Sequence, residues 1–116
     1  MPPTPQLLSR LPLPPSVFLI LLSLAEGEAH GYQIRKDVIA RSDGAVRLDP
    51  GSLYRLIGRL LDDGLITEVA RPGGTDEDAR RRYYRLTPEG RRVLLRETDR
   101  LADLVAQVRA RRPRKA

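Results

Sequence analysis

Cysteine and tryptophan are absent from this chain of 116 residues, and histidine occurs once, at His30. Without cysteine there is no disulfide framework, no thiolate metal site and no cysteine nucleophile. One histidine leaves little material for a metal cluster or a Ser-His-Asp arrangement, and the paired acids lie at turn positions without signs of burial. We therefore expect no catalytic site, no metal site and no cofactor, and we do not expect an enzyme.

Long hydrophobic runs are also scarce. The main apolar run, residues 17–25, is about half of the ~20 residues that a membrane span needs. A signal peptide is disfavoured because the preceding segment is rich in proline and carries only Arg10, and because Glu26 follows directly. A buried first helix is the favoured interpretation over secretion. We expect no membrane partner and a cytoplasmic location.

The positive charge is concentrated at one end. The formal net charge is +6, but five of the 21 basic residues lie in the last eight positions. The preceding residues carry 16 basic against 15 acidic side chains, so the basicity is partly an effect of the tail. What matters for nucleic-acid binding is therefore where the remaining arginines cluster.

Proline, glycine and capping signals divide the chain into one small domain with tails. Six of the ten prolines fall within residues 1–15, which predicts a disordered arm. The capping and periodicity signals predict helices over residues 16–26, 31–41, 50–63 and 88–111. A short extended segment at 46–48, a hairpin of strands 66–71 and 80–86, and a basic tail at 112–116 complete the prediction. The predicted fold is mainly α with a small β-hairpin: a winged helix-turn-helix DNA-binding domain over residues 16–87 and a long C-terminal dimerisation helix.

The third helix has two faces of different chemistry. At ~100° per residue, the apolar face comprises Leu53, Leu56, Ile57, Leu60 and Leu61, and the opposite face comprises Ser52, Arg55, Arg59 and Asp62, with Tyr54 at the border. A recognition helix uses its early turns to reach base edges, and arginine pairs with guanine through two hydrogen bonds. This pattern predicts a helix for the major groove; an amphipathic surface helix with solvated arginines is the alternative.

The predicted hairpin and the start of the second helix supply further DNA-binding candidates. They are Arg80, Arg81, Arg82 and Arg85 on the wing, and Tyr32, Gln33 and Lys36 on the second helix. Arginines on a β-ribbon can contact backbone phosphates, and amides at a helix N-terminus favour anions. The acidic residues Asp76, Glu77 and Asp78 complicate the wing tip, since they can repel phosphate or pair with the arginines. His30 is interpreted as a turn or capping residue rather than a ligand.

Two apolar surfaces exceed what one small domain can cover. They are Val17, Phe18 and Leu21 on the first helix, and a near-heptad stripe of Leu94, Leu101, Leu104, Val105 and Val108 on the last. A helix of ~24 residues extends ~36 Å, and heptad-like spacing is typical of a helix that packs on another helix. We interpret both surfaces as a dimer interface; the alternative is that the last helix folds back onto its own core.

Four segments together resemble the PadR family of transcriptional regulators. They are residues 30–32 (HGY), 50–60 (PGSLYRLIGRL), 63–66 (DGLI) and 82–90 (RYYRLTPEG). The resemblance implies a dimeric winged helix-turn-helix repressor of the compact branch with a short C-terminal helix, usually controlled by a small ligand. It also implies that the C-terminal helix packs on the partner's first helix.

These observations predict a homodimeric, sequence-specific DNA-binding transcriptional regulator that acts as a ligand-responsive repressor. Its expected partners are double-stranded DNA with a pseudo-palindromic operator, a second copy of the chain and a small-molecule effector. The alternative is a protein-interaction module on a winged-helix scaffold, which would use the first and last helices to bind a protein partner.

Overall fold

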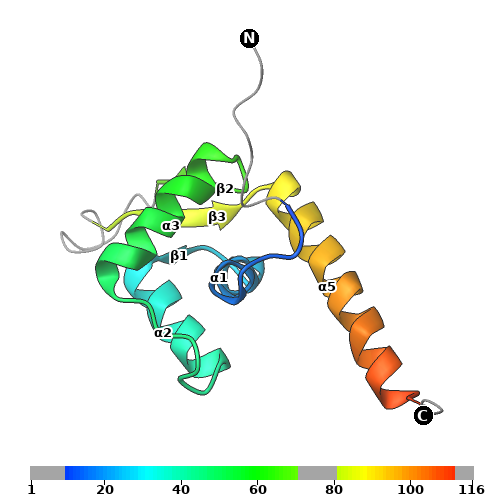
Figure 1. Cartoon of the computed structure of the whole chain (residues 1–116). Helices are drawn as coiled ribbons and strands as arrows, with labels where there is room; N and C mark the ends of the chain where they lie inside the picture. Colours follow the sequence, from blue (N-terminus) through cyan, green and yellow to red (C-terminus); the bar gives the residue numbers. More distant parts are fainter. Residues whose placement is uncertain (1–9, 71–80, 112–116) are drawn as a thin grey trace.

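The computed structural model describes residues 10–70 and 81–111, which form helices around a small sheet (Figure 1). The elements are α1 (Pro15–Ala25), β1 (Ala29–His30), α2 (Gly31–Arg41), α3 (Pro50–Asp62), β2 (Ile66–Val69), β3 (Tyr83–Leu86) and α5 (Pro88–Arg109). The sheet is antiparallel with strand order β1-β3-β2. This confirms the predicted fold class, a mainly α winged helix-turn-helix with a long C-terminal helix.

The predicted helix starts rest on side-chain caps that are present in the structure. The Asp49 carboxylate accepts the Ser52 backbone N–H at 2.8 Å at the start of α3. The Thr87 hydroxyl accepts the Gly90 backbone N–H at 3.0 Å at the start of α5. Because both helices also begin with proline, which lacks an N–H and has a helical φ, these two starts could be read from sequence.

The short strand before α3 is absent, and this corrects the prediction for residues 46–48. The third strand of the sheet is β1, which precedes α2 and pairs Ala29 with Tyr84 and His30 with Tyr83. The backbone of the 46–48 segment is held by α2 and the turn after it: Ser42 Oγ accepts the Val46 N–H at 3.0 Å, and Arg35 donates to the Leu48 carbonyl at 2.6 Å. These bonds direct the segment to α2 rather than to the sheet. β2 and β3 are also shorter than expected, since pairing runs only from Ile66–Leu86 to Val69–Tyr83.

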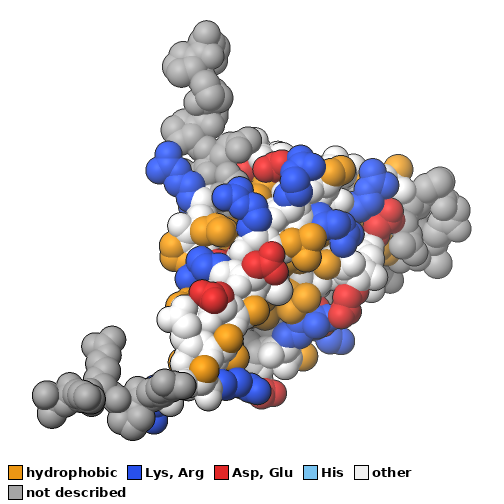
Figure 2. All heavy atoms as spheres, turned by 90° about the vertical axis from the view of Figure 1, so that its right-hand side faces the viewer, with side chains coloured by type: hydrophobic (Ala, Val, Ile, Leu, Met, Phe, Trp, Pro, Cys, Tyr) orange, Lys and Arg blue, Asp and Glu red, His pale blue; other side chains and the backbone are white. Residues whose placement is uncertain are grey.

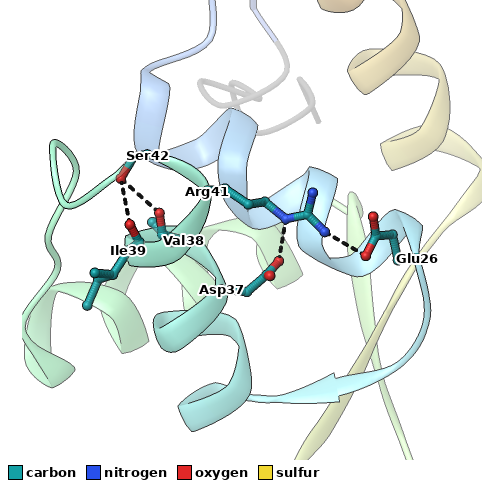
Figure 3. Close-up of polar contacts among 6 residues, drawn as sticks. All are labelled: Glu26, Asp37, Val38, Ile39, Arg41 and Ser42. Carbon is teal, nitrogen blue, oxygen red and sulfur yellow. Dashed lines mark hydrogen bonds and ion pairs between the residues drawn. The ribbon is translucent and has the colours of Figure 1, made fainter.

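The end of α2 is fixed against α1 and the following turn (Figure 3). Arg41 donates to Asp37 one turn earlier and forms an ion pair with Glu26, which follows α1. Ser42 donates to the Val38 carbonyl at 2.9 Å and so caps the helix. The turn between α2 and α3 therefore starts from a rigid position, which sets where α3 is presented.

α1 lies at the centre of the molecule (Figure 1) and contacts α2, β3 and α5. Val17, Ile20 and Leu21 are completely buried within the chain. The chain's own elements therefore account for part of the apolar character of α1, whereas Phe18, Leu19 and Leu22 are only half-buried. No helix in the described residues is both long and apolar enough to span a bilayer.

The last residues of the segment predicted as a disordered arm, residues 1–15, are part of the folded domain. Pro15 already belongs to α1, Leu13 is buried, and the Leu13 N–H donates to Glu97 Oε2 of α5 at 2.6 Å. Residues 1–9, as well as the tail at 112–116, lie outside the described residues. The segment before α1 is therefore attached to α5 by a buried hydrogen bond.

α5 changes its environment along its length. Val93, Leu94 and Glu97 in its first half are buried against the core, whereas Leu104 and Val108 in its second half are exposed. The helix extends away from the other elements towards the C-terminus (Figure 1). Its 22 residues correspond to ~33 Å at 1.5 Å per residue. The apolar stripe of α5 thus packs in the core in the first half of the helix and is exposed to solvent in the second half.

Candidate nucleic-acid interface

α3 has the two faces that its sequence predicts. Leu53, Ile57 and Leu60 are buried in the core, and Arg55 and Arg59 are exposed on the opposite side. A helix anchored by three large side chains presents its outer face in a fixed orientation. The two arginines are therefore displayed from a rigid support.

The start of α3 carries a chain of three hydrogen bonds. One carboxylate oxygen of Asp49 accepts the Ser52 N–H, and the other accepts the Ser52 hydroxyl at 3.1 Å. The Ser52 oxygen in turn accepts from Nη2 of Arg55 at 3.0 Å. The Ser52 backbone N–H, followed by its hydroxyl, lowers the pKa of Asp49 below its ordinary value, because both hydrogen bonds favour the carboxylate. Asp49 thus remains ionised, as an acceptor only, at neutral pH.

A hollow of about 390 Å³ lies where α2, α3 and the wing strand approach each other. Its lining residues are His30, Gly31, Tyr32, Tyr54, Arg81 and Arg82. Tyr32 and Tyr54 are 59% and 53% exposed, and the Lys36 ammonium lies 5.3 Å from the centroid of the Tyr32 ring. Two phenol groups, two guanidinium groups and a nearby ammonium surround this hollow, so its chemistry suits an anion. The structure brings these predicted residues together from three separate segments.

Gly31 provides the space for one wall of this hollow. A β-carbon at this position would lie 2.5 Å from the Tyr54 hydroxyl oxygen, which is closer than real β-carbons approach. The backbone at Gly31 has no unusual φ, so the glycine is needed here for close approach rather than for conformation. It lets the Tyr54 ring lie directly against the start of α2.

His30 is a capping residue, as predicted. Its Nδ1 accepts the Gln33 N–H at 3.3 Å, and its own N–H donates to the Gln33 side chain at 3.1 Å, which completes a capping box. Its Nε2 lies 3.1 Å from Nη1 of Arg81, and its ring packs edge-on against Tyr83 at 5.3 Å. The cap of α2 therefore lies directly beside the wing. Gln33, which is predicted to bind DNA, uses its side-chain oxygen in this cap.

The structure separates the wing arginines into two groups. Arg81 and Arg82 line the hollow, whereas Arg85 lies apart, 3.9 Å from Glu28. A second hollow of about 630 Å³ surrounds Arg85; its other lining residues are Leu86, Thr87, Pro88, Arg91, Arg92 and Leu95. Arg85 therefore does not share a site with the other wing candidates. Arg80 and the acidic residues Asp76, Glu77 and Asp78 lie outside the described residues.

The adjacent tyrosines of β3 are both packed inside. Tyr83 and Tyr84 are 6% and 3% exposed, and burial raises the pKa of Tyr84 above its ordinary value. Neighbouring strand residues point to opposite faces, so each tyrosine needs its own cover. Tyr84 belongs to the hydrophobic core, and the His30 ring packs edge-on against Tyr83.

Three of the predicted dimer residues belong to the chain's own core, which corrects that expectation. Val17, Leu21 and Leu94 are buried within one chain and have no surface to offer a partner. Phe18 and Leu101 are half-buried. The exposed members of the stripe are Leu104, Val105 and Val108. The face that α5 presents carries hydrophobic side chains interleaved with arginines (Figure 2).

Glu97 is a buried acid that the sequence reasoning missed. It is 1% exposed and accepts hydrogen bonds from the Leu13 N–H and the Arg100 guanidinium. The Arg100 hydrogen bond is the main cause that lowers its pKa, despite the opposing effect of burial. The sequence feature that could have predicted its burial is its position: Glu97 lies one turn after Val93, where the α5 stripe would otherwise carry an apolar residue.

The whole arrangement can be compared with known proteins. The model of the transcriptional regulator PadR-like family matches residues 20–96, which is more than half of the chain. The chain belongs to the PadR-like family. The matched residues run from within α1 to within α5 and include α3 and the wing strands. PadR-like proteins are transcriptional regulators and not enzymes, in agreement with the expectation from composition.

Individual relatives support this membership. The PadR-like chain is 34% identical over 89 residues to the transcriptional regulator Rv3488 of Mycobacterium tuberculosis, covering 77% of this chain and 78% of that protein. It is 41% identical over 90 residues to an uncharacterized 37.1 kDa protein in transposon TN4556 of Streptomyces fradiae. That match covers 78% of this chain but only 24% of the transposon protein.

A solved structure is similar over most of its length. A PadR family transcription regulator from Clostridium difficile R20291 superposes with a TM-score of 0.67 at 25% identity. The match covers 78% of the PadR-like chain and 91% of the solved one. The helices and the wing that surround the candidate interface are therefore arranged as in a solved member of the family.

Proposed function

We propose that this PadR-like chain is a homodimeric repressor that binds a specific DNA sequence by placing α3 in the major groove. The observation that carries the proposal is the exposure of Arg55 and Arg59 on a helix whose other face is buried in the core. Arginine can pair with the N7 and O6 acceptors of guanine, which are available in the major groove. Cytoplasm is the compartment we infer, because the protein has to reach chromosomal DNA.

The hollow beside α3 supports a second kind of DNA contact. Tyr32, Tyr54, Arg81 and Arg82 would hold backbone phosphates next to the groove, with Lys36 nearby. Phosphate contacts fix the position of a protein on the duplex without reading its sequence. In this proposal the hollow sets the register of the protein on DNA, and α3 reads the bases.

The exposed half of α5 supports a dimer. Leu104, Val105 and Val108 continue the same stripe that Val93 and Leu94 bury in the core. An apolar stripe that extends past its own domain is stabilised by contact with another helix, and a second copy supplies one of the right length. Two α3 helices would then enter major grooves about one helical turn, ~34 Å, apart on a pseudo-palindromic operator.

Repression and control by a small ligand complete the proposal. A repressor occupies its operator until a ligand favours a different state of the dimer. A ligand that binds between the two chains would change the separation of the two α3 helices, so that both no longer fit successive grooves. Among the described residues no aromatic pair marks such a ligand site. Control by a ligand is therefore proposed from membership of the PadR-like family alone.

Selection of bound sequences from a random duplex pool tests the proposal. We expect a pseudo-palindromic consensus with half-sites about one helical turn apart. The variant Arg55→Ala/Arg59→Ala should lose specific retardation in a gel shift. The control Arg91→Ala/Arg96→Ala, on α5, makes the same change in charge and should keep it. An unselective pool, or unchanged specificity without Arg55 and Arg59, would contradict the proposal.

The exposed stripe also favours a second candidate function, a protein-interaction module that uses α1 and α5. Such a module would bind a different protein through Leu104, Val105 and Val108. Salt separates the two functions: DNA binding weakens steeply as salt rises, whereas an apolar interface barely responds. A monomer in light scattering together with salt-insensitive partner binding would favour the module.

A further inference from the structure

The start of α3 connects its cap to one of its exposed arginines. Asp49 uses both carboxylate oxygens on Ser52, one for the backbone N–H at 2.8 Å and one for the hydroxyl at 3.1 Å. Ser52 then has its oxygen available to accept from Arg55 at 3.0 Å. The Asp49 carboxylate thus caps the helix and also holds the Ser52 hydroxyl, whose oxygen accepts the hydrogen bond from Arg55.

We propose that Asp49 and Ser52 are positioning residues that hold Arg55 ready to read a guanine in the major groove. The inference rests on the proposed function, since it needs α3 to enter that groove. Asp49 would then contribute to sequence specificity in addition to capping α3, and the preferred base is guanine.

The geometry leaves Arg55 able to make the reading contact. A guanidinium has five N–H donors, and the bond to Ser52 uses one of them, at Nη2. Guanine needs two, for O6 and N7. A long side chain that is already held in one place loses less conformational freedom on binding than a free one. The smaller entropy cost favours only the base whose acceptors match the fixed position of Arg55, so it increases discrimination between bases.

Arg59 provides an internal comparison, one turn further along the same face. Its side chain has no hydrogen bond or ion pair within residues 10–70 and 81–111. An arginine without such support adapts to whichever acceptor is near, including phosphate oxygens. Loss of Arg59 should therefore weaken binding to all sequences alike, whereas loss of Arg55 should reduce the preference for one base.

Two substitutions separate the cap from the positioning bond. Ser52→Ala removes the hydroxyl and leaves Asp49 able to cap α3 through the backbone N–H. Asp49→Ser keeps a good capping residue but leaves a single, uncharged side-chain oxygen, for which the Ser52 N–H and the Ser52 hydroxyl compete. Thermal denaturation shows whether both variants fold. If Asp49→Ser does not fold, Ser52→Ala alone tests the positioning bond.

The measurement is a ratio of two Kd values: the Kd for an operator in which the guanine opposite Arg55 is replaced by adenine, divided by the Kd for the selected operator. Arg55→Ala should lower this ratio about tenfold or more, and Ser52→Ala and Asp49→Ser about threefold to tenfold. The dependence of Kd on salt should stay as in the unchanged protein, because the phosphate contacts are retained. In the Arg55→Ala background, Ser52→Ala should have no further effect.

Several outcomes would overturn the inference. Unchanged discrimination in Ser52→Ala and Asp49→Ser, with loss in Arg55→Ala, would show that Arg55 reads the base without support. A further loss from Ser52→Ala when Arg55 is already absent would show that Ser52 contacts the base itself. In both cases the proposed function stands. A protein that selects no sequence at all would instead contradict the proposed function, and the inference with it.

Discussion

The backbone N–H of Leu13 donates to the carboxylate of Glu97, 84 residues later in the chain, at 2.6 Å. Both residues are buried. The segment that precedes α1 is therefore attached to α5, the helix that we propose forms the dimer. The stability of this attachment depends on one buried acid.

Glu97→Ala should destabilise the protein by about 2–3 kcal/mol, because it leaves the buried Leu13 N–H without an acceptor. Urea denaturation followed by circular dichroism measures the change. Glu89→Ala is the matched control: Glu89 pairs with Arg92 three residues away at the surface, and such pairs contribute about 0–1 kcal/mol. Equal losses in the two variants would contradict a special role for Glu97.

The same carboxylate should make stability sensitive to acid. The pKa of Glu97 is lowered in the folded chain, mainly by Arg100, relative to about 4.3 in an unfolded one. A lowered folded pKa contributes stability that is fully present above the unfolded pKa and is lost as the pH falls through the folded pKa. The free energy of unfolding should thus decrease as the pH falls below about 4–5, and Glu97→Gln should show a smaller decrease.

Gly31→Ala should damage the hollow beside α3. The added methyl group would push the far end of the exposed Tyr54 side chain out of its place, so we expect weaker DNA binding and a loss of stability of no more than about 1 kcal/mol. Alanine otherwise favours a helix over glycine, so any loss points to the contact. Tyr54→Ala removes the obstacle. In that background Gly31→Ala should be neutral or stabilising, and a loss of the same size there would assign the effect to another neighbour.

Arg82 and Arg85 should differ in DNA binding although only two residues lie between them. Arg82 lines the hollow with Tyr32 and Tyr54, whereas Arg85 lies near Glu28 in the second hollow. Arg82→Ala should weaken binding to all sequences and reduce the slope of log K against log salt by about one, as for one lost phosphate contact. Arg85→Ala should leave the slope unchanged. If Arg85→Ala reduces the slope and Arg82→Ala does not, the DNA lies on the other side of the wing.

The dimer should depend on the outer half of the α5 stripe. Val105→Asp places a charge on the exposed apolar face without touching the core, so we expect a folded monomer in light scattering at micromolar concentration. Leu95→Asp is the matched control, because Leu95 is 54% exposed on a different face of α5, against 50% for Val105. A monomer from Leu95→Asp and a dimer from Val105→Asp would move the interface to the opposite side of the helix.

Local signals in the sequence determined the elements around the candidate site. The caps at Asp49 and Thr87, the prolines that follow them and the apolar spacing of α3 act within one helical turn, so neighbouring residues suffice to read them. They predicted α2, α3 and the start of α5, and they placed Arg55 and Arg59 on the outer face of α3. The capping role of His30 is also local, because its partner Gln33 lies three residues away.

Only the tertiary structure decided which segments meet. Val46 and Ala29 both precede helices, but only Ala29 joins the sheet, because it pairs with Tyr84 far along the chain, whereas Val46 is held by the nearby Ser42. Burial of Val17 by the chain's own helices and separation of Arg85 from Arg82 follow from packing between segments. Hydrophobicity and charge show that a side chain needs a partner, but they do not specify which one, because many surfaces provide the same chemistry.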